Sequence, residues 1–569
     1  MPLSILRNFN SYAMLLLFLL VLIVPALLSW PLGLAMTRLI DPAGESGYSR
    51  CSARFFSKIG GEAVIEEQEW KRYLLSMMIF NVLMFAFVAI VLAMQQWLPL
   101  NPDGKGALEA SLIFNTVASF VTNTNLQHYS GEVSMSYFSQ LFGLMWLQFV
   151  SAATGVSALA ALARALGGKK TVGNYYSDLM RTTFFVLLPL ALFVALLLVA
   201  GGVPMTMEGA AVAHTLEHAT QTIARGPVAA MEAIKQLGTN GGGWFGPNSA
   251  HPFENPSFFT NILECISIVL IPMATVWMFG RITGRMRDAV VIFSVMMALL
   301  VFKAGAAVWF EGAPAIALSS LPVDVVSNLE GKELRFGSGA GALWAAVTTA
   351  TSNGSVNCMH DSLNPLTGLV PLVGMWLNVV FGGVGVGLIN MFVFIIVGVF
   401  ICGMMVGRTP EYFGRKVETP EMTLALLTLL VHPALILGST ALFAATPLGA
   451  ATVGNPGAHG FTEILYEFSS SAANNGSGFA GLGNSSIPWN IATGIVMLLG
   501  RYIPIILPLA IAGSLAAKKP VPVTAGTFRT DTLLFGIIIL GSVVFISALL
   551  FLPVAVLGPV ADHLTAIIH

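Results

Sequence analysis

The segment LGTNGGGWFGPN, from Leu237 to Asn248, lies between two apolar runs of a strongly hydrophobic chain. Its five glycines, two asparagines and one threonine disfavour a continuous helix and offer little apolar surface. Non-helical backbone at membrane depth is stable only where protein buries it or water reaches it, because unpaired N–H and C=O groups in hydrocarbon are costly. The segment therefore predicts a sheltered, re-entrant turn.

The composition predicts a membrane protein. The chain has 569 residues, of which 56% are hydrophobic and 10% charged, and its mean hydropathy is +0.80. Soluble domains carry about 25% charged residues, and a helix needs about 20 apolar residues to span a bilayer. Ten such runs predict an all-α integral membrane protein with ten transmembrane helices. Their centres fall near Leu20, Met84, Trp146, Leu190, Ile268, Met296, Val384, Leu430, Leu498 and Ile539.

The distribution of basic residues predicts the orientation. If the N-terminus is outside, most lysines and arginines fall in connections that face the inside, as the positive-inside rule requires. The four longest connections, which follow the second, fourth, sixth and eighth spans, then face the outside. A cleaved signal peptide is the alternative for the first run, since Arg7 precedes an apolar stretch from Ala13. Because no small-residue cleavage site follows, we favour a retained helix.

Each outer connection contains the same arrangement of a helix-compatible stretch, a polar turn and then a span. The stretches cover residues 107–121, 228–238, 341–350 and 462–472. The turns read Thr122-Asn123-Thr124-Asn125, Thr239-Asn240-Gly241-Gly242, Thr351-Ser352-Asn353-Gly354 and Ala473-Asn474-Asn475-Gly476. Their starts are 117, 112 and 122 residues apart, which indicates a fourfold internal repeat with the first and tenth spans as additions.

Four polar turns in one chain can shelter one another by meeting around an axis. Glycine suits that place because it reaches backbone angles that point successive carbonyls the same way. A ring of carbonyl oxygens can replace the hydration shell of a cation, and the partly negative ends of the preceding helices would face the same point. The turns contain no carboxylate, which favours a monovalent cation over Ca²⁺ or Mg²⁺. Re-entrant loops with a purely structural role are the alternative, but the repetition favours an ion site.

Seven motifs resemble those of one known family. They read SFVTNTNLQHYSGE, AIKQLGTNGGGW, MHDSLNPL, VFGGVGVGL, GRTPEYFGRK, NPGAHGF and IAGSLAAKKP, and extend from about the second span to the end of the chain. The chain is thereby similar to the potassium-binding A subunits (KdpA) of the bacterial Kdp potassium-transporting ATPase. The resemblance implies four pseudo-repeats, as in the superfamily of potassium transporters related to tetrameric channels. The expected division is an N-terminal span and inside loop at 1–60, pore repeats at 61–170, 171–285, 286–418 and 419–520, and a C-terminal span at 521–569.

The resemblance also implies the site residues. A filter formed by the four turns would bind K⁺, the only metal expected, from outside a bacterial inner membrane that the chain crosses many times. Gln127 would lie just behind the first turn. Carried over by motif, the filter positions are Thr122, Asn123, Thr124, Asn125, Thr239, Asn240, Gly241, Gly242, Gly243, Thr351, Ser352, Asn353, Gly354, Ser355, Asn474, Asn475, Gly476 and Ser477.

A transport role would require a partner that supplies energy. The nearest approach to a nucleotide-binding loop, LGGKKT at Leu166 to Thr171, has lysine where serine or threonine is needed, and the chain lacks the D-K-T-G-T segment of P-type ATPases. We therefore expect a non-catalytic subunit without a nucleotide site. The resemblance implies a P-type ATPase B subunit, a C subunit and a small F subunit as partners, together with membrane lipids and no nucleic acid.

Two features within spans indicate a pathway below the filter. Arg501 falls near the middle of the ninth span, and charges at such depth are functional by default. It would either hold the fold by pairing with an internal carboxylate or act as a barrier to cations. Glu264, in the fifth span, is the other charge at such depth. FGGVGVGLIN, which contains Gly382, Gly383 and Gly385, predicts a broken seventh span that could obstruct the axis. Close helix packing through small residues is the alternative.

Rival functions remain open at this point. A stand-alone K⁺ channel or symporter of the same superfamily would share the four turns. HTLEH, His214 to His218, fits the H-x-x-E-H pattern of some metalloproteases, but no third zinc ligand is evident and an outer-surface helix is expected there. The four cysteines, Cys51, Cys265, Cys358 and Cys402, form no C-x-x-C motif, and we expect ordinary buried side chains rather than a metal site or disulfides.

Overall fold

A computed structural model describes residues 3–41, 55–58, 60–313, 328–407, 409–521 and 529–568. Within these ranges, ten helices are long and apolar enough to cross a membrane, which confirms the predicted number of spans. They are α1 (Leu3–Ile40), α3 (Trp70–Ala93), α6 (Trp146–Leu166) preceded by the π-helical Ser139–Met145, α7 (Tyr175–Arg181) joined through the π-helical Thr182–Leu187 to α8 (Leu188–Ala200), α10 (Phe258–Ile282), α11 (Met286–Glu311), α14 (Val386–Val406), α15 (Thr419–Ala444), α18 (Ile487–Ala517), and α19 (Leu533–Ala555) continued by the π-helical Val556–Val560 and α20 (Ala561–Ile568).

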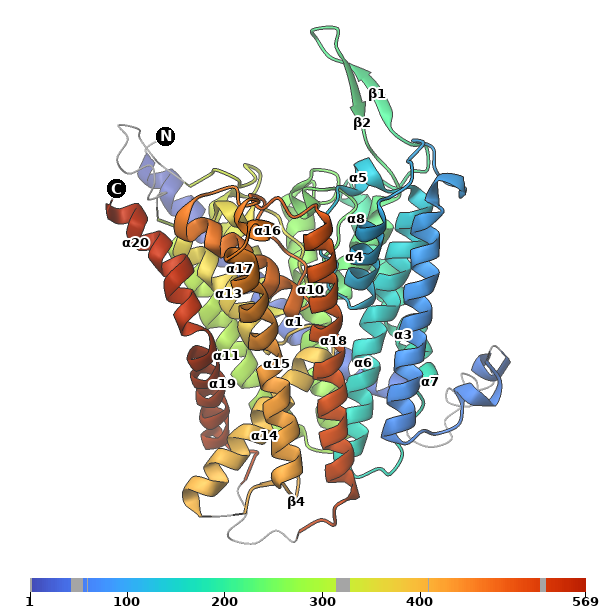
Figure 1. The fold of residues 1–569 in the computed structure, drawn as a ribbon, viewed down its shortest axis with the longest axis vertical. Coiled ribbons are helices and arrows are strands. Elements are labelled where there is room, and N and C mark those ends of the chain that lie inside the picture. Colours follow the sequence, from blue (N-terminus) through green and yellow to red (C-terminus); the bar gives the residue numbers. More distant parts are fainter. Residues whose placement is uncertain are drawn as a thin grey trace.

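Five shorter helices lie between the spans, in the half of the molecule nearer a protruding β-hairpin (Figure 1). Four are the expected half-helices: α4 (Ala110–Val121), α9 (Val228–Leu237), α12 (Gly337–Ala350) and α17 (Gly457–Ala472). The last two begin four or five residues earlier than predicted, at glycines whose φ angles are positive. The fifth, α13 (Pro365–Leu377), precedes α14.

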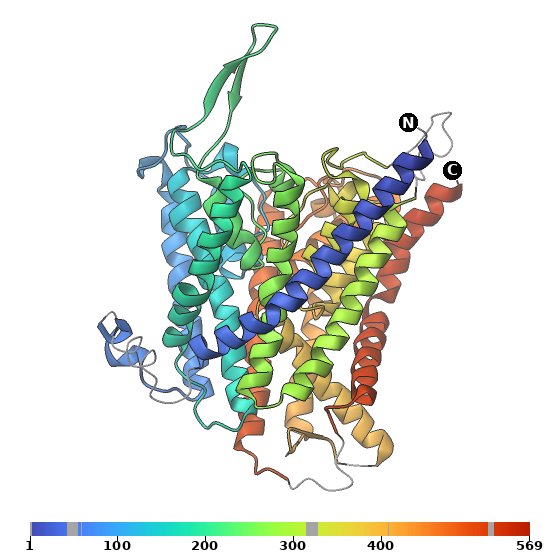
Figure 2. The same cartoon turned by 180° about the vertical axis from the view of Figure 1, so that it is seen from behind.

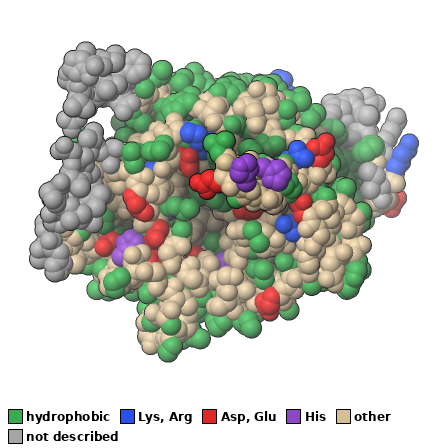
Figure 3. Space-filling view, turned by 90° about the horizontal axis from the view of Figure 1, so that it is seen from above, with side chains coloured by type: hydrophobic (Ala, Val, Ile, Leu, Met, Phe, Trp, Pro, Cys, Tyr) green, Lys and Arg blue, Asp and Glu red, His purple; other side chains and the backbone are tan. Residues whose placement is uncertain are grey.

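The remaining elements are small. Single turns of helix are Gly61–Val64, Gln95–Trp97, α5 (Gly131–Ser134), Asn248–Ala250, His360–Ser362 and α16 (Pro447–Ala450). The strands β1 (Ala211–His214) and β2 (Thr220–Ile223) form the protruding antiparallel hairpin, and β3 (Glu411–Tyr412) pairs with β4 (Arg415–Lys416) at the other end of the molecule (Figure 1). We call the end that carries β1 and β2 the hairpin face. Figure 3 views it from above, with charged side chains scattered across it and hydrophobic ones along much of its edge.

The hairpin corrects one prediction. HTLEH was expected on an outer-surface helix, but His214 ends β1 and the next residues form the turn that leads into β2. Leu216 at the turn is fully exposed. The alternating small and β-branched residues on both sides pair as strands, and the two histidines therefore do not share a helical face as the metalloprotease pattern requires.

The spans form an inner and an outer shell. The most hydrophobic stretch of the third span is buried along its whole length, whereas the corresponding stretches of the second, eighth and tenth spans are 28% buried. The fully buried span is rich in alanine and also contains serine, threonine and glycine, small residues that permit close packing on all sides. The outer helices carry exposed leucine, isoleucine and phenylalanine side chains, as a lipid-facing surface requires.

The first span packs obliquely across the inner shell. Figure 2 shows α1 crossing the molecule at a steep angle to its neighbours, with the N-terminus and C-terminus at the hairpin face. Its main partner is α10. Trp30 contacts Trp277 edge-on with ring centroids 4.9 Å apart, and the Trp277 indole N–H donates to the Ser29 hydroxyl over 2.9 Å. A buried indole N–H needs such an acceptor, so this pair fixes where the two helices cross.

The seventh span is broken, as its glycines predict, but its centre was predicted wrongly. The seventh spanning helix covers Val386–Met405, so Val384 lies before it in a non-helical segment, residues 378–385. The apolar stretch read as one span combines the end of α13 with the start of α14. Four residues of the segment, Asn378, Phe381, Gly382 and Gly385, have positive φ angles that interrupt the helix.

Candidate ion-binding ring

Each half-helix ends in a turn with the same backbone geometry. The residues that cap the helices are Thr122, Gly238, Thr351 and Ala473. The first and third residues after each cap have positive φ angles, and the one between them does not. The positive pairs are Asn123 and Asn125, Thr239 and Gly241, Ser352 and Gly354, and Asn474 and Gly476.

This geometry shifts the register of the second turn by one residue. Sequence comparison placed Thr239 opposite Thr122 and Thr351, but the residue that caps α9 is Gly238. In each repeat, the backbone N–H of the residue two positions after the cap donates to the carbonyl of the residue three positions before the cap. These bonds join Thr124 to Ser119, Asn240 to Lys235, Asn353 to Thr348 and Asn475 to Ser470, over 2.9–3.0 Å. Both turns contain Thr-Asn, which suggested that Thr239 corresponds to Thr122. In the structure Thr239 corresponds to Asn123, because each is the first residue after the cap of its helix.

The same alignment explains why the first turn can lack glycine. Asn125 occupies the position of Gly241, Gly354 and Gly476, with a φ angle of 57°. Asparagine is the residue besides glycine that most readily adopts left-handed backbone angles, since its short polar side chain can bond locally. The four turns therefore share one backbone path despite their different sequences.

The turns contact one another in the closed order first, second, third, fourth and first. Side-chain amides join neighbouring repeats at each step. The bonds run from Asn123 Nδ2 to the Thr239 carbonyl (2.8 Å), from Asn353 Nδ2 to the Lys235 carbonyl (3.2 Å), from Asn475 Nδ2 to the Thr348 carbonyl (3.3 Å) and from Asn474 Nδ2 to Thr124 Oγ1 (2.9 Å). The predicted filter residues are thus brought together into a ring, almost all of them buried.

Backbone fits against backbone inside the ring. A Cβ added at Gly241 would lie 1.8 Å from the carbonyl oxygen of Asn353. At Gly354 and Gly476 it would lie 2.1 Å and 2.0 Å from the carbonyl oxygens of Asn475 and Thr124. No side chain fits in these three places, so glycine is required both by φ and by space.

Gln127 follows the first turn in the chain, and its side chain clamps the second turn. Its side-chain amide accepts from the Gly243 N–H over 2.9 Å and donates to the Gly243 carbonyl over 3.0 Å. The same amide nitrogen contacts the Tyr129 hydroxyl at 3.2 Å. A residue of the first repeat thereby fixes the backbone of the second.

Two further polar residues that sequence reasoning missed support the ring. Gln148 in α6 donates to the Gly242 carbonyl over 3.0 Å. Asn248 donates to the Gly241 carbonyl over 2.7 Å and accepts from the Val356 N–H, so it links the second and third repeats. Gln148 could have been found as the one amide side chain of α6, whereas Asn248 offered no comparable signal.

The broken segment 378–385 lies on the side of the ring away from the hairpin face, where the half-helices end. The Val384 N–H donates to Thr239 Oγ1 over 3.0 Å, and Asn378 Nδ2 donates to the Ala473 carbonyl over 3.2 Å. Ser352 Oγ donates to Asn378 Oδ1 over 2.6 Å. Three of the four turns therefore contact this segment, and Gly382, Gly383 and Gly385 are buried within it.

Arg501 lies next to this segment and is buried. Its guanidinium donates to the Ser151 carbonyl over 3.2 Å, and a Cβ at Gly155 would lie 3.3 Å from Arg501 Nη2 and 2.3 Å from the Val384 carbonyl. Among the residues that the structure describes, no carboxylate forms an ion pair with Arg501, so the predicted internal ion pair has no partner there. Glu264 instead belongs to a separate cluster behind α9.

Lys303 in α11 is also buried, and it was not predicted. Its ammonium donates to Thr349 Oγ1 over 2.7 Å, near the C-terminal end of α12, where the helix dipole favours positive charge. Lys303 also lines an apolar cavity of about 400 Å³ between α11, α13 and α19. A smaller cavity of about 40 Å³ adjoins the broken segment, with Asn378, Asn390 and His432 among its walls.

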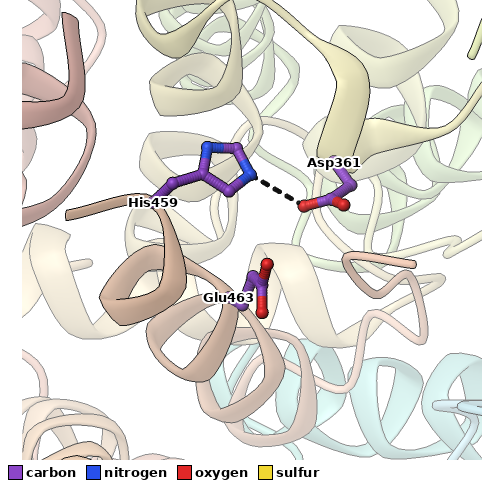
Figure 4. Close-up of side chains that lie close together, drawn as sticks. All are labelled: Asp361, His459 and Glu463. Carbon is purple, nitrogen blue, oxygen red and sulfur yellow. Dashed lines mark hydrogen bonds and ion pairs between the residues drawn. The ribbon is translucent and has the colours of Figure 1, made fainter. Parts of the chain in front are cut away.

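One cluster near the hairpin face could hold a metal by composition. Figure 4 shows Asp361, before α13, beside His459 and Glu463 of α17, with potential ligand atoms within 4.8 Å of one another. These atoms already have partners: the two His459 nitrogens contact Asp361 and Asp562, each over 2.9 Å, and Glu463 accepts from the N–H groups of Gly454 and Asn455.

The cluster is therefore an ion-pair network rather than a vacant ligand set. Burial opposes the charge on His459, but the hydrogen bonds that its ring nitrogens donate to the Asp361 and Asp562 carboxylates prevail and raise the pKa of His459 to about 10. Imidazolium cannot bind a metal, because both ring nitrogens carry protons. The three described cysteines, Cys265, Cys358 and Cys402, are free thiols, and Cys51 lies outside the described residues.

The fold and the ring define a helical membrane protein built from four repeats around a ring of turns. The fold resembles that of the potassium transporter TrkH from Vibrio parahaemolyticus, with a TM-score of 0.50 and 13% identity over 86% of this chain and 97% of that one. Residues 18–564 match the family described as potassium-transporting ATPase A subunit, and the chain belongs to that family.

Relatives in several bacteria bear a consistent description. The chain is 49% identical over 522 residues to the potassium-transporting ATPase potassium-binding subunit of Geobacillus kaustophilus, a match covering 90% of this chain and 93% of the relative. It is 47% identical over 544 residues to the subunit of the same name from Caldanaerobacter subterraneus, covering 95% and 97%. The resemblance stated from the sequence motifs is thereby confirmed.

Proposed function

We propose that this chain is the potassium-binding subunit of an ATP-driven K⁺ uptake complex, and that K⁺ binds in the ring of four turns. The observation that carries the proposal is the closed ring itself, in which four chemically different turns keep one backbone path. Relatives across nearly the whole chain are named potassium-binding subunits, which supports K⁺ as the transported ion.

The chemistry of the ring suits a monovalent cation. Backbone carbonyls and the oxygens of threonine, asparagine and serine are neutral donors, and the C-terminal ends of four half-helices add partial negative charge. A dehydrated divalent ion would require carboxylates, which the turns lack. We assign K⁺ contact to the filter positions named above, with Gln127 fixing the second turn.

The region below the ring supports a sideways exit. The segment 378–385 with its buried glycines lies across the side away from the hairpin face, and Arg501 places a positive charge beside it. Both features oppose a straight path for a cation. The small cavity with Asn378, Asn390 and His432 in its wall offers polar atoms beside the obstruction, toward α15 and α19. We propose that the ion leaves in this direction to a partner.

The partner would supply the energy. The sequence contains neither a complete nucleotide-binding loop nor the D-K-T-G-T segment of P-type ATPases. ATP hydrolysis is therefore assigned to a P-type ATPase B subunit, with C and small F subunits completing the complex. In this arrangement the chain crosses the bacterial inner membrane with the hairpin face, and hence the N-terminus, outside. K⁺ would enter the ring from that face.

The test compares the chain alone with the complete complex. Purification in mild detergent should yield an ATPase partner whose turnover is stimulated by K⁺, and ⁸⁶Rb⁺ should bind the complex in competition with K⁺. Proteoliposomes containing only this chain should show no ATP-independent K⁺ flux. Conductance or coupled uptake by the lone chain would favour a stand-alone channel or symporter instead, and absence of K⁺ binding would reject the site.

A further inference from the structure

Two of the four half-helices carry a glutamate at the same structural position. The residues located six positions before the caps are Thr116, Glu232, Ala345 and Glu467. Glu232 belongs to the second repeat and Glu467 to the fourth, and the closed contact order of the turns places these repeats on opposite sides of the ring. Both side chains are almost completely buried, at 1% and 0% exposure.

Glu467 has one carboxylate oxygen in use and one free. Oε1 contacts His128 Nε2 at 2.9 Å and accepts from Asn484 Nδ2 at 3.1 Å. Oε2 has no hydrogen-bond partner among the described residues. A Cβ added at Gly478 would lie 3.2 Å from Oε2, so the free oxygen faces the non-helical segment that leads from the fourth turn toward the hairpin face.

The second repeat carries more carboxylates than it can neutralise. Lys235 donates its three protons to Glu232 (2.9 Å), Glu254 (2.6 Å) and the Ser249 hydroxyl (2.7 Å). Glu264 shares the donors Gln236 and Ser249 with Glu232, and its Oε1 has no partner among the described residues. Three buried carboxyl groups thus surround one ammonium. Burial raises the pKa of Glu254, so the cluster retains protons and its charge is smaller than the count of carboxyl groups suggests.

The carboxyl groups around Lys235 also contact the non-helical segment that follows the second turn. A Cβ at Gly243 would lie 2.8 Å from Glu254 Oε1, which accepts from the Phe245 N–H over 2.7 Å. Gly243 and Gly478 each follow their cap by five residues, so they are equivalent positions in the second and fourth repeats. A carboxyl group therefore lies against the equivalent glycine in two repeats on opposite sides of the ring.

We propose that Glu467 is a positioning residue for cation binding, which places negative charge behind the fourth turn at the end of the ring nearer the hairpin face. The inference rests on the proposed function of the ring. Within a protein, a buried unit charge some 12 Å from a cation changes its affinity by about tenfold at an effective dielectric constant near 20. A free carboxylate oxygen in a buried site destabilises the fold, so a structural role alone leaves Glu467 Oε2 unexplained.

The experiment uses the full chain in its complex and measures K⁺ affinity by calorimetry and ⁸⁶Rb⁺ competition at fixed pH and ionic strength. Glu467→Gln keeps the shape and removes the charge, and we expect about tenfold weaker binding with an unchanged melting temperature. Glu467→Asp, which restores the charge, should recover most of the affinity. Glu463→Gln is the matched control, because Glu463 is a buried glutamate on the same helix whose oxygens bind backbone N–H groups away from the turn.

Glu254→Gln is the comparison on the opposite side, where the Lys235 ammonium and the retained protons already offset the carboxyl groups, so it should weaken K⁺ binding less than Glu467→Gln does. If the wild-type complex binds no K⁺, the proposed function fails. If it binds K⁺ and Glu467→Gln binds K⁺ as tightly as the wild type, the positioning role of Glu467 is rejected. A loss of affinity that follows a loss of melting temperature and is not recovered by aspartate would also reject it.

Discussion

The carbonyl oxygen of Asn353 lies 1.8 Å from the point where a Cβ on Gly241 would be, so the third turn leaves no room for a side chain on the second. A Cβ on Gly354 of the third turn would likewise collide with the Asn475 carbonyl of the fourth, and one on Gly476 of the fourth turn with the Thr124 carbonyl of the first. The ring is therefore held by direct contact between backbones, and a change at one turn is transmitted to its neighbour.

Gly241→Ala should disrupt cation binding without unfolding the protein. The added methyl group collides with the neighbouring backbone and the residue has a φ angle of 90°, so overpacking and strain together cost about 1–3 kcal/mol. We expect K⁺ affinity to fall by about tenfold or more, measured by ⁸⁶Rb⁺ competition. Gly284→Ala is the control, because Gly284 has a φ angle of 70° but no described atom within 4 Å of its Cβ position. Equal affinity in both variants would contradict the placement of Gly241 in the site.

Gln127→Leu should loosen the second turn. The substitution removes both hydrogen bonds to Gly243, each worth about 1 kcal/mol, and leaves the Gly243 N–H unpaired. K⁺ affinity should decrease by about tenfold in calorimetric titration. Tyr129→Phe removes only the contact between the Tyr129 hydroxyl and the Gln127 amide and should leave the affinity within about twofold. A similar loss in both variants would mean that Gln127 acts through Tyr129 instead.

The number of spans and the existence of four turns were predictable because they depend on local features. Hydropathy over about 20 residues locates a span whatever its neighbours are, and the polar turns interrupt apolar sequence in a recurrent way. The broken seventh span was likewise indicated by glycines that include Gly382 and Gly385, although its centre was misplaced because α13 and α14 form one apolar stretch.

The errors and omissions concern features that depend on distant parts of the chain. The register of the second turn follows from where α9 ends at Gly238, not from the letters that follow. HTLEH could not be recognised as a hairpin turn without the pairing of β1 with β2. Asn248 looks like any loop asparagine in sequence, and its bond to Gly241 exists only because the chain returns to the ring.

Arg501→Ala should open a leak. If the buried guanidinium beside residues 378–385 repels cations, its removal should permit ATP-independent K⁺ flux into proteoliposomes loaded with a K⁺ indicator. Arg501→Lys keeps the positive charge and should show no ATP-independent K⁺ flux. Normal, ATP-dependent flux in the alanine variant combined with a lower melting temperature would show that Arg501 only stabilises the fold.

His459 should stabilise the protein in a pH-dependent way. Its pKa is raised from the usual 6.5 to about 10 by Asp361 and Asp562, the latter located in α20. A group whose pKa is higher in the folded state stabilises that state fully below the unfolded pKa, so the contribution is complete below about pH 6.5, declines above it and is gone above about pH 10. The melting temperature of the wild type should therefore exceed that of His459→Gln at about pH 6, and the two should converge near about pH 10. His214→Gln, at the exposed hairpin, is the control and should match the wild type throughout. A difference between wild type and His459→Gln that stays constant over this range would show that packing, not the charged bridge between α17 and α20, is responsible.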